Sequence, residues 1–287
     1  MIKQIQKKIS IIKFLYEKGL FAIFLYVLHK LKISNLYNIY YGKNSSPDFN
    51  KKKIQLRNKI LNISNSRVIS GFYKSTYLHQ EKVFNQIHLA SQLIGCYELQ
   101  VQKKIIDMKN QYKLRNLVNF GAGNGFHVLG LILNNFFKQG FCFEIDPEQI
   151  KLLTININKN ELEKKISIHS EASFEKTKLL LTKNELRKTI FLIDIEGAEF
   201  SLINKDSIHI IKNSYLIIEN HSYRFSKKDT LNFWKVIDEN FDYKLINSSA
   251  RDPWAIKELD DLFEDEKWIA ISESRPTMNW IVCVPKK

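Results

Sequence analysis

The chain has 287 residues, 44% of them apolar and 26% charged, a composition typical of a soluble globular protein that can bury a sizeable core. No stretch offers the roughly 18 uninterrupted apolar residues of a membrane span, and the basic N-terminus lacks the small-residue cleavage site of a secretory signal. Cys96, Cys142 and Cys283 lie far apart without metal-ligand spacing, so we expect a reduced, cytoplasmic setting.

The net charge of +14 is concentrated near the N-terminus. Residues 1–60 carry 13 Lys or Arg and two acids, or +11, which leaves only +3 for the rest of the chain. Apolar residues recur at helical spacing from Ile2 to Tyr16, with lysines between them. Residues 1–32 could therefore lie on the anionic inner face of a membrane. The alternative is a pair of helices that pack on the main domain or on a second subunit.

These patterns divide the chain into two parts. Residues 1–60 form a basic amphipathic helical extension, and the polar, proline-bearing segment 43–53 is expected to be its linker. Residues 61–287 form the main domain, with a helical lead-in over 61–112 and a sheet core over 113–287.

Helical and extended patterns alternate along the main domain. From about residue 78 to 110 the pattern predicts a helix with a break at Gly95. The candidate strands are Leu117–Phe120, Phe141–Ile145, Ile166–His169, Thr189–Ile193, Tyr215–Glu219, Tyr243–Asn247 and Trp280–Pro285. The segments 126–138, 147–160 and 199–211 between them show helical spacing. This alternation predicts a parallel sheet covered on both faces, which binds ligands at the carboxyl ends of its strands.

The first strand ends in three alternating glycines, Gly121, Gly123 and Gly125. Glycine permits positive φ and lets a ligand approach the main chain closely. The nicotinamide fingerprint G-x-G-x-x-G would need a further glycine where Phe126 stands, so a nicotinamide enzyme is disfavoured. The spacing G-x-G-x-G instead resembles the first motif of class I methyltransferases, whose loop holds the methionine part of S-adenosylmethionine.

Two acids lie at the end of the second strand. Glu144 lies 19 residues after Gly125, the placement expected of an acid that accepts both ribose hydroxyls. Asp146 competes for this role, but with Pro147 it is expected to start the next helix. In the resemblance, Asn119 replaces the acid that often begins the motif, and it can accept a hydrogen bond from the ligand amino group without charge assistance.

The third strand leads into Glu171 and Ala172, which resemble the methyltransferase pair that touches the adenine. The alternative is that Glu171 caps a helix. His127, directly after the glycine loop, is a further candidate for cofactor contact.

The string DIEGAE after the fourth strand is the most specific in the chain. Asp194, Glu196 and Glu199 lie within six residues, and acids so close repel one another unless a proton, a cation or a basic group intervenes. The string resembles the hallmark of FkbM-type methyltransferases. The strand YLIIENH (215–221) matches that family's strand ending in an acid and a histidine, and Tyr97 and Glu98 match a Tyr-Glu pair ahead of the glycine loop.

The resemblance covers about residues 71–287 and implies a fold and an activity. The fold is a Rossmann-like, seven-stranded methyltransferase sheet, mostly parallel with an antiparallel C-terminal strand and helices on both faces. The activity is methyl transfer from S-adenosylmethionine to a hydroxyl of a sugar, glycan or other small molecule. The implied cofactor-binding residues are Asn119, Gly121, Gly123, Gly125, Glu144, Glu171, Tyr97 and Glu98.

A hydroxyl nucleophile must lose its proton, and Asp194, Glu196 and His221 at the ends of strands four and five are the candidate bases. The same three residues could instead bind a divalent metal, an alternative we do not favour. Two other functions stay open. One is an RNA methyltransferase that uses the basic extension, although the sequence contains no recognisable RNA-binding module. The other is a non-catalytic scaffold that binds the cofactor. The acceptor and the oligomeric state are not predicted.

Overall fold

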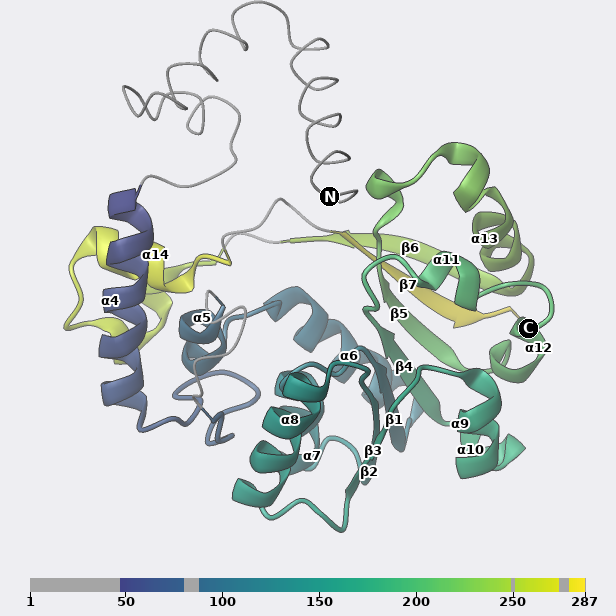
Figure 1. Ribbon diagram of the computed structural model, residues 1–287, viewed down its shortest axis with the longest axis horizontal. Helices are drawn as coiled ribbons and strands as arrows, with labels where there is room; N and C mark the ends of the chain where they lie inside the picture. Colours follow the sequence, from purple (N-terminus) through teal and green to yellow (C-terminus); the bar gives the residue numbers. More distant parts are fainter. Residues whose placement is uncertain (1–46, 80–87, 249–250, 274–278, 287) are drawn as a thin grey trace, which may run out of the picture. The chain divides into compact units, whose positions relative to one another are not determined.

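The computed structural model describes residues 47–79, 88–248, 251–273 and 279–286 (Figure 1). By its internal contacts the chain divides into residues 1–56 and 57–287. The predicted amphipathic helices of residues 1–32 lie outside the described part. Of the helices within the described ranges, none is long and apolar enough to cross a membrane.

Helix α4 (Pro47–Ser64) begins inside the predicted linker and runs across the predicted boundary at residue 60. The prediction of a linker is therefore wrong from Pro47 onwards. Proline suits the first turn of a helix, because its φ is already helical and its missing N–H has no partner there in any case.

One sheet of seven strands dominates the described residues, in the order β3-β2-β1-β4-β5-β7-β6. The strands are β1 (Asn116–Phe120), β2 (Gln139–Phe143), β3 (Ile166–His169), β4 (Thr189–Ile193), β5 (Tyr215–Glu219), β6 (Phe241–Asn247) and β7 (Asn279–Pro285). Strands β1 to β5 pair in parallel, whereas β7 runs antiparallel to both β5 and β6. The predicted fold class, a mostly parallel methyltransferase sheet with an antiparallel C-terminal strand, is confirmed.

Helices cover both faces of the sheet (Figure 1). On one face Phe120, Phe191 and Leu216 of the strands form a single buried cluster with side chains of the covering helices. The helices contributing to it are α9 (Phe174–Leu180), α10 (Lys183–Leu186), α12 (Ile208–Ile211) and α13 (Lys227–Asn240). Helices α7 (Phe126–Leu133) and α8 (Pro147–Lys159) lie along the other face (Figure 1). Because strand side chains alternate between the faces, the fully buried strands read as continuous apolar runs.

The predicted helix 199–211 is wrong in its middle, where two short helices, α11 (Glu199–Leu202) and α12, replace it. The Asn204 side chain accepts hydrogen bonds from the N–H groups of Asp206 and Ser207, at 2.8 and 3.0 Å. Such local bonds from a short polar side chain compete with the helical ladder, so the helix stops. The predicted helix 126–138 also ends early, at Leu133.

The lead-in contains helices α5 (Leu89–Ile94) and α6 (Leu99–Tyr112), separated at Gly95. Gly95 has φ +88°, so the predicted break is confirmed. At 78–79 and 95–98 the predicted helix is absent, because Leu78 pairs with the backbone of Ser66 and Gly95 closes α5.

Tyr73, in the segment between α4 and α5, is fully buried and packs edge-on against Phe126, with ring centroids 5.1 Å apart. A Cβ atom added to Gly130 of α7 would lie 2.2 Å from the Tyr73 ring. The ring therefore occupies the space that a side chain on this turn of α7 would need.

The short helices of the C-terminal part lie between β6 and β7. They are α14 (Glu264–Ile271) and the single turns η2 (Pro253–Ala255) and η3 (Lys257–Leu259). A further single turn, η1 (Ser222–Arg224), follows β5. The sequence pattern is weak in these places because each element is only one or two turns long.

Candidate functional site

The glycine loop joins β1 to α7 with all three of its predicted glycines in left-handed conformations. The φ angles are +76° at Gly121, +53° at Gly123 and +87° at Gly125. A Cβ atom at Gly121 would lie only 1.7 Å from the carbonyl oxygen of Asp194. The loop therefore passes directly against the end of β4, an approach that only glycine permits.

Glu144, at the end of β2, lies beside this loop. Its Oε2 accepts the N–H of Gly123 at 2.7 Å, and its Oε1 accepts the N–H groups of Ile145 and Asp146 at 2.8 and 3.0 Å. These bonds turn the chain out of the strand, which explains why β2 ends before Ile145. Asp146 caps α8 by accepting the N–H of Glu148 at 2.9 Å, as predicted.

Asn119 and Glu171 occupy very different surroundings. Asn119 is buried in β1, and its Nδ2 donates to the carbonyl of Leu192 at 3.4 Å. Glu171 is exposed and pairs with Lys176 at 3.3 Å. The alternative in which Glu171 caps a helix is wrong, because Ser173 caps α9. The contacts of Asn119 and Glu171 with a cofactor stay predictions.

Glu98 is buried at the N-terminal end of α6, next to the first turn of α7. Its carboxylate contacts Nε2 of His127 at 2.7 Å, and Nδ1 of His127 lies 3.1 Å from the Tyr73 hydroxyl. The Tyr97 ring packs on Phe126, with centroids 5.6 Å apart. The predicted Tyr-Glu pair is thus joined to the helix that follows the glycine loop, and His127 lies between two buried side chains.

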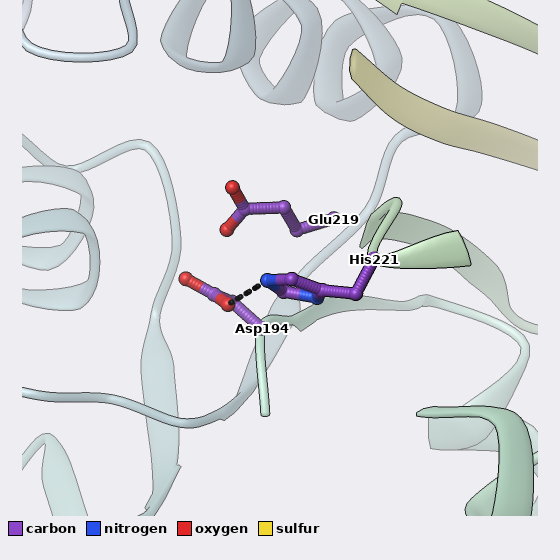
Figure 2. A group of neighbouring side chains, drawn as sticks. All are labelled: Asp194, Glu219 and His221. Carbon is purple, nitrogen blue, oxygen red and sulfur yellow. Dashed lines mark ion pairs between the residues drawn. The ribbon is translucent and has the colours of Figure 1, made fainter. Parts of the chain in front are cut away.

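A second group of side chains gathers where β4 and β5 end. These strands are parallel neighbours, with Ile193 opposite Ile218. Figure 2 shows Asp194, from the end of β4, and Glu219 and His221, from the end of β5, pointing toward one another. One donor atom from each lies within 4.8 Å of the others, and Nε2 of His221 is 3.9 Å from Oδ1 of Asp194. Two carboxylates and an imidazole are a donor set that suits a divalent metal.

His221 is held in place by Glu199. The Glu199 side chain has no exposed surface, and its Oε1 accepts the N–H of Ile195 at 2.8 Å and lies 3.2 Å from Nδ1 of His221. A carboxylate only accepts, so Nδ1 carries the hydrogen. Nε2 therefore faces Asp194 and Glu196.

Burial and neighbouring charges shift the titration of this group. Burial raises the pKa of Asp194 to about 6, against the lowering effect of its hydrogen bond with Glu219. Burial lowers the pKa of His221. The hydrogen bond and charge of Glu199, together with the charges of Asp194 and Glu196, raise it by more, so the pKa of His221 lies above its ordinary value. The cluster can therefore hold a proton, or a cation in its place, near neutral pH.

Glu196 lies at the open rim of the cluster. It has φ +56° and precedes Gly197 with φ +108°, a turn that directs its side chain outwards. Its carboxylate is 72% exposed, pairs with Arg224 at 2.6 Å and lies 3.8 Å from Nε2 of His221. The three predicted bases, Asp194, Glu196 and His221, thus lie together.

The sequence did not assign roles to Glu199 or Glu219. Glu199 is the last acid of DIEGAE and Glu219 the last residue of its strand, so both stood in recognised motifs. Their contacts could not be read from spacing, since they depend on which way the chain turns after each strand.

No protein-family model matches the sequence, and the comparison with curated proteins found no match. Solved structures resemble it distantly. The M1A22 tRNA methyltransferase TrmK of Bacillus subtilis is 10% identical over 65% of either chain, with a TM-score of 0.44. A candidate O-methyltransferase from Klebsiella pneumoniae is 7% identical over 88% of this chain and 96% of its own, with a TM-score of 0.44. Precorrin-6y C5,15-methyltransferase from Geobacter metallireducens is 10% identical over 72% and 92%, with a TM-score of 0.42. Likeness at this level says nothing about substrate.

We expect Gly121→Ala to destabilise the protein by about 2 to 5 kcal/mol, because the new Cβ atom would overlap the Asp194 carbonyl at a positive φ. Gly123→Ala is the matched control, since its Cβ would meet nothing nearer than 4.0 Å, and only the left-handed backbone penalty of about 1 to 2 kcal/mol remains. Thermal unfolding measures both, and equal losses would contradict the close approach.

A second prediction concerns the imidazole of His221, observed by ¹⁵N NMR with a chelator present. We expect hydrogen on Nδ1 in the neutral ring, and a lower His221 pKa in Glu199→Gln, because the charge of Glu199 favours the imidazolium. Since a raised pKa contributes stability that disappears as pH rises through it, the variant should lose stability mainly on the acid side of that pKa. Hydrogen on Nε2, or an unchanged pKa, would contradict the assigned contact.

Proposed function

We propose that this chain is an S-adenosylmethionine-dependent methyltransferase of FkbM type that methylates a hydroxyl of a sugar, a glycan or another small molecule. The observation that carries the proposal is the pairing of the glycine loop with Glu144, through the 2.7 Å hydrogen bond from the Gly123 N–H. A backbone cradle and a strand-end acid side by side are what a nucleoside cofactor requires.

The residues around the loop fit such a cofactor. A Cβ atom at Gly123 would meet only Gln149, at 4.0 Å, so the loop borders open space there. Glu144 uses three of the four acceptor positions of its carboxylate for backbone amides, and the remaining position, on Oε2, can accept a ribose hydroxyl. We assign the methionine part to the three glycines and Asn119, with Tyr97 and Glu98 beside them, and the adenine to the side of Glu171.

When bound, S-adenosylmethionine supplies a methyl group on a positively charged sulfur. In the transfer, the acceptor oxygen forms a bond to the methyl carbon while the carbon–sulfur bond breaks, and the hydroxyl proton passes to a base. Much of the rate enhancement comes from holding oxygen and carbon in line. The ends of β4 and β5 supply the groups that hold the acceptor.

The proton passes to a carboxylate at the rim of the cluster. Asp194 is 30% and Glu196 is 72% exposed at the side chain, whereas His221 is 2% exposed. A base must come within hydrogen-bond reach of the proton it removes, which favours the two acids. Tyr223, exposed at the same rim, is available to contact the acceptor, and Arg224 pairs there with Glu196.

We expect calorimetric titration of the full chain to show binding of S-adenosylmethionine and none of NAD. Glu144→Gln should weaken this binding about 10- to 100-fold, since a hydrogen bond to a charged group contributes roughly 1.5 to 3 kcal/mol. Glu148→Gln, which removes the same charge from the exposed first turn of α8, should bind like wild type.

The outcomes separate the alternatives. A folded protein that binds no S-adenosylmethionine contradicts the proposal, and binding of NAD alone would indicate a nicotinamide enzyme. Cofactor binding without transfer to any acceptor would support a scaffold. RNA binding that falls with salt and is lost on deleting residues 1–60 would support an RNA methyltransferase.

A further inference from the structure

The end of β5 brings a buried acid, Glu219, to the predicted bases, and this changes what the cluster can hold. Glu219 and His221 are no more than 2% exposed, and Oδ1 of Asp194 is buried without a hydrogen-bond partner. Two carboxylates in such a place carry two negative charges that a proton or a cation must offset. Arg224, the cation at the rim, is engaged by Glu196 at 2.6 Å.

We propose that Asp194, Glu219 and His221 bind one divalent cation of the Mg²⁺ or Mn²⁺ type, through one oxygen from each acid and Nε2 of the imidazole. Donors that share one such cation at about 2.1 to 2.4 Å lie up to about 4.2 to 4.8 Å apart. The three donor atoms all lie within 4.8 Å of one another. Donors at right angles on an octahedral cation lie about 3 Å apart, so side-chain movements of about 1 Å or more would bring the three to ligand distance.

Glu199 prepares the imidazole for this role. Its Oε1, 3.2 Å from Nδ1, accepts the ring N–H and leaves the lone pair of Nε2 directed toward Asp194. The dashed line in Figure 2 marks the ion pair between His221 and Asp194. A carboxylate behind a ligating histidine is the usual support of such a ligand, because it fixes the tautomer and raises the basicity of the ring. This contact is independent of the two acids and distinguishes the site from a mere acidic cluster.

The donor set selects the cation class. Carboxylate oxygens suit Mg²⁺ and Mn²⁺, and the single imidazole shifts the preference toward Mn²⁺. Asp194 is 30% exposed, so one side of the site is open to water or to an acceptor hydroxyl. A hydroxyl bound there loses its proton more easily, and Glu196, 3.8 Å from Nε2 of His221 and outside the donor set, is left to take it. This last step rests on the proposed methyl transfer, whereas cation binding does not.

The test is the binding of Mn²⁺ to the full chain, measured by calorimetry and by electron spin-echo spectroscopy. We expect one Mn²⁺ per chain with a ¹⁴N coupling from a ligating imidazole, and competition by Mg²⁺. Glu199→Gln should weaken binding about 10- to 100-fold, and Glu219→Gln by at least about as much. Glu148→Gln, which removes the same charge from the exposed first turn of α8, should stay within about threefold of wild type.

Three results would overturn the inference: no Mn²⁺ bound by the folded wild type, no nitrogen coupling, or equal losses in Glu219→Gln and Glu148→Gln. Circular dichroism of each variant identifies a loss of binding caused by unfolding. A failure here is distinguishable from a failure of the proposed function, because S-adenosylmethionine binding at the glycine loop is measured separately. A chain that binds the cofactor but no Mn²⁺ refutes only the cation.

Discussion

The two halves of the candidate site depend on one close approach, that of the glycine loop to the end of β4. The loop touches the Asp194 carbonyl where only a hydrogen atom fits, and backbone bonds hold it on both sides. Gly121 donates to the carbonyl of Phe143 at 2.9 Å, and Asp194 donates to that of Phe120 at 3.0 Å. Asp194 thus offers its backbone to the loop and its carboxyl group to the cluster, so the two halves cannot shift independently.

The cluster itself is costly to the fold. Buried carboxylates lose hydration that their neighbours replace only in part, so such groups contribute little to stability and are more often retained for function. The sheet brings them together because parallel strands end at the same edge. Glu199 then orients His221 from a third direction, without any contact with solvent. The fold therefore gathers several carboxylates around the imidazole of His221 instead of spacing them apart.

Much of the sheet was predictable, because its buried strands are short apolar runs bounded by polar residues. Ile166–His169, Thr189–Ile193 and Tyr215–Glu219 have the predicted bounds. The strand order was not derivable from periodicity, which says nothing about which strands pair. The resemblance carried by the glycine spacing and DIEGAE predicted a seven-stranded, mostly parallel sheet with an antiparallel C-terminal strand, and the order of the strands came from the structure.

The direction of individual side chains was beyond prediction. In DIEGAE, Glu196 points outward and Glu199 inward because of consecutive left-handed residues at Glu196 and Gly197, and no spacing rule predicts φ +56° at a glutamate. The prediction of a single helix over 199–211 was wrong for a related reason, since the hydrogen bonds of the Asn204 side chain form only in one backbone conformation. Periodicity indicates which residues are buried, but it does not predict which hydrogen bonds the polar side chains form.

The buried ring of Tyr73 has a consequence for how the protein is assembled as a folding unit. Helix α7 leaves a gap at Gly130 that this ring fills, and the phenol hydroxyl lies 3.1 Å from His127, which in turn contacts Glu98. The lead-in therefore completes the packing around α7 and does not merely lie on its surface. We therefore expect the lead-in and the sheet to unfold together as one cooperative unit, and a truncation that removes the lead-in to destabilise the sheet domain.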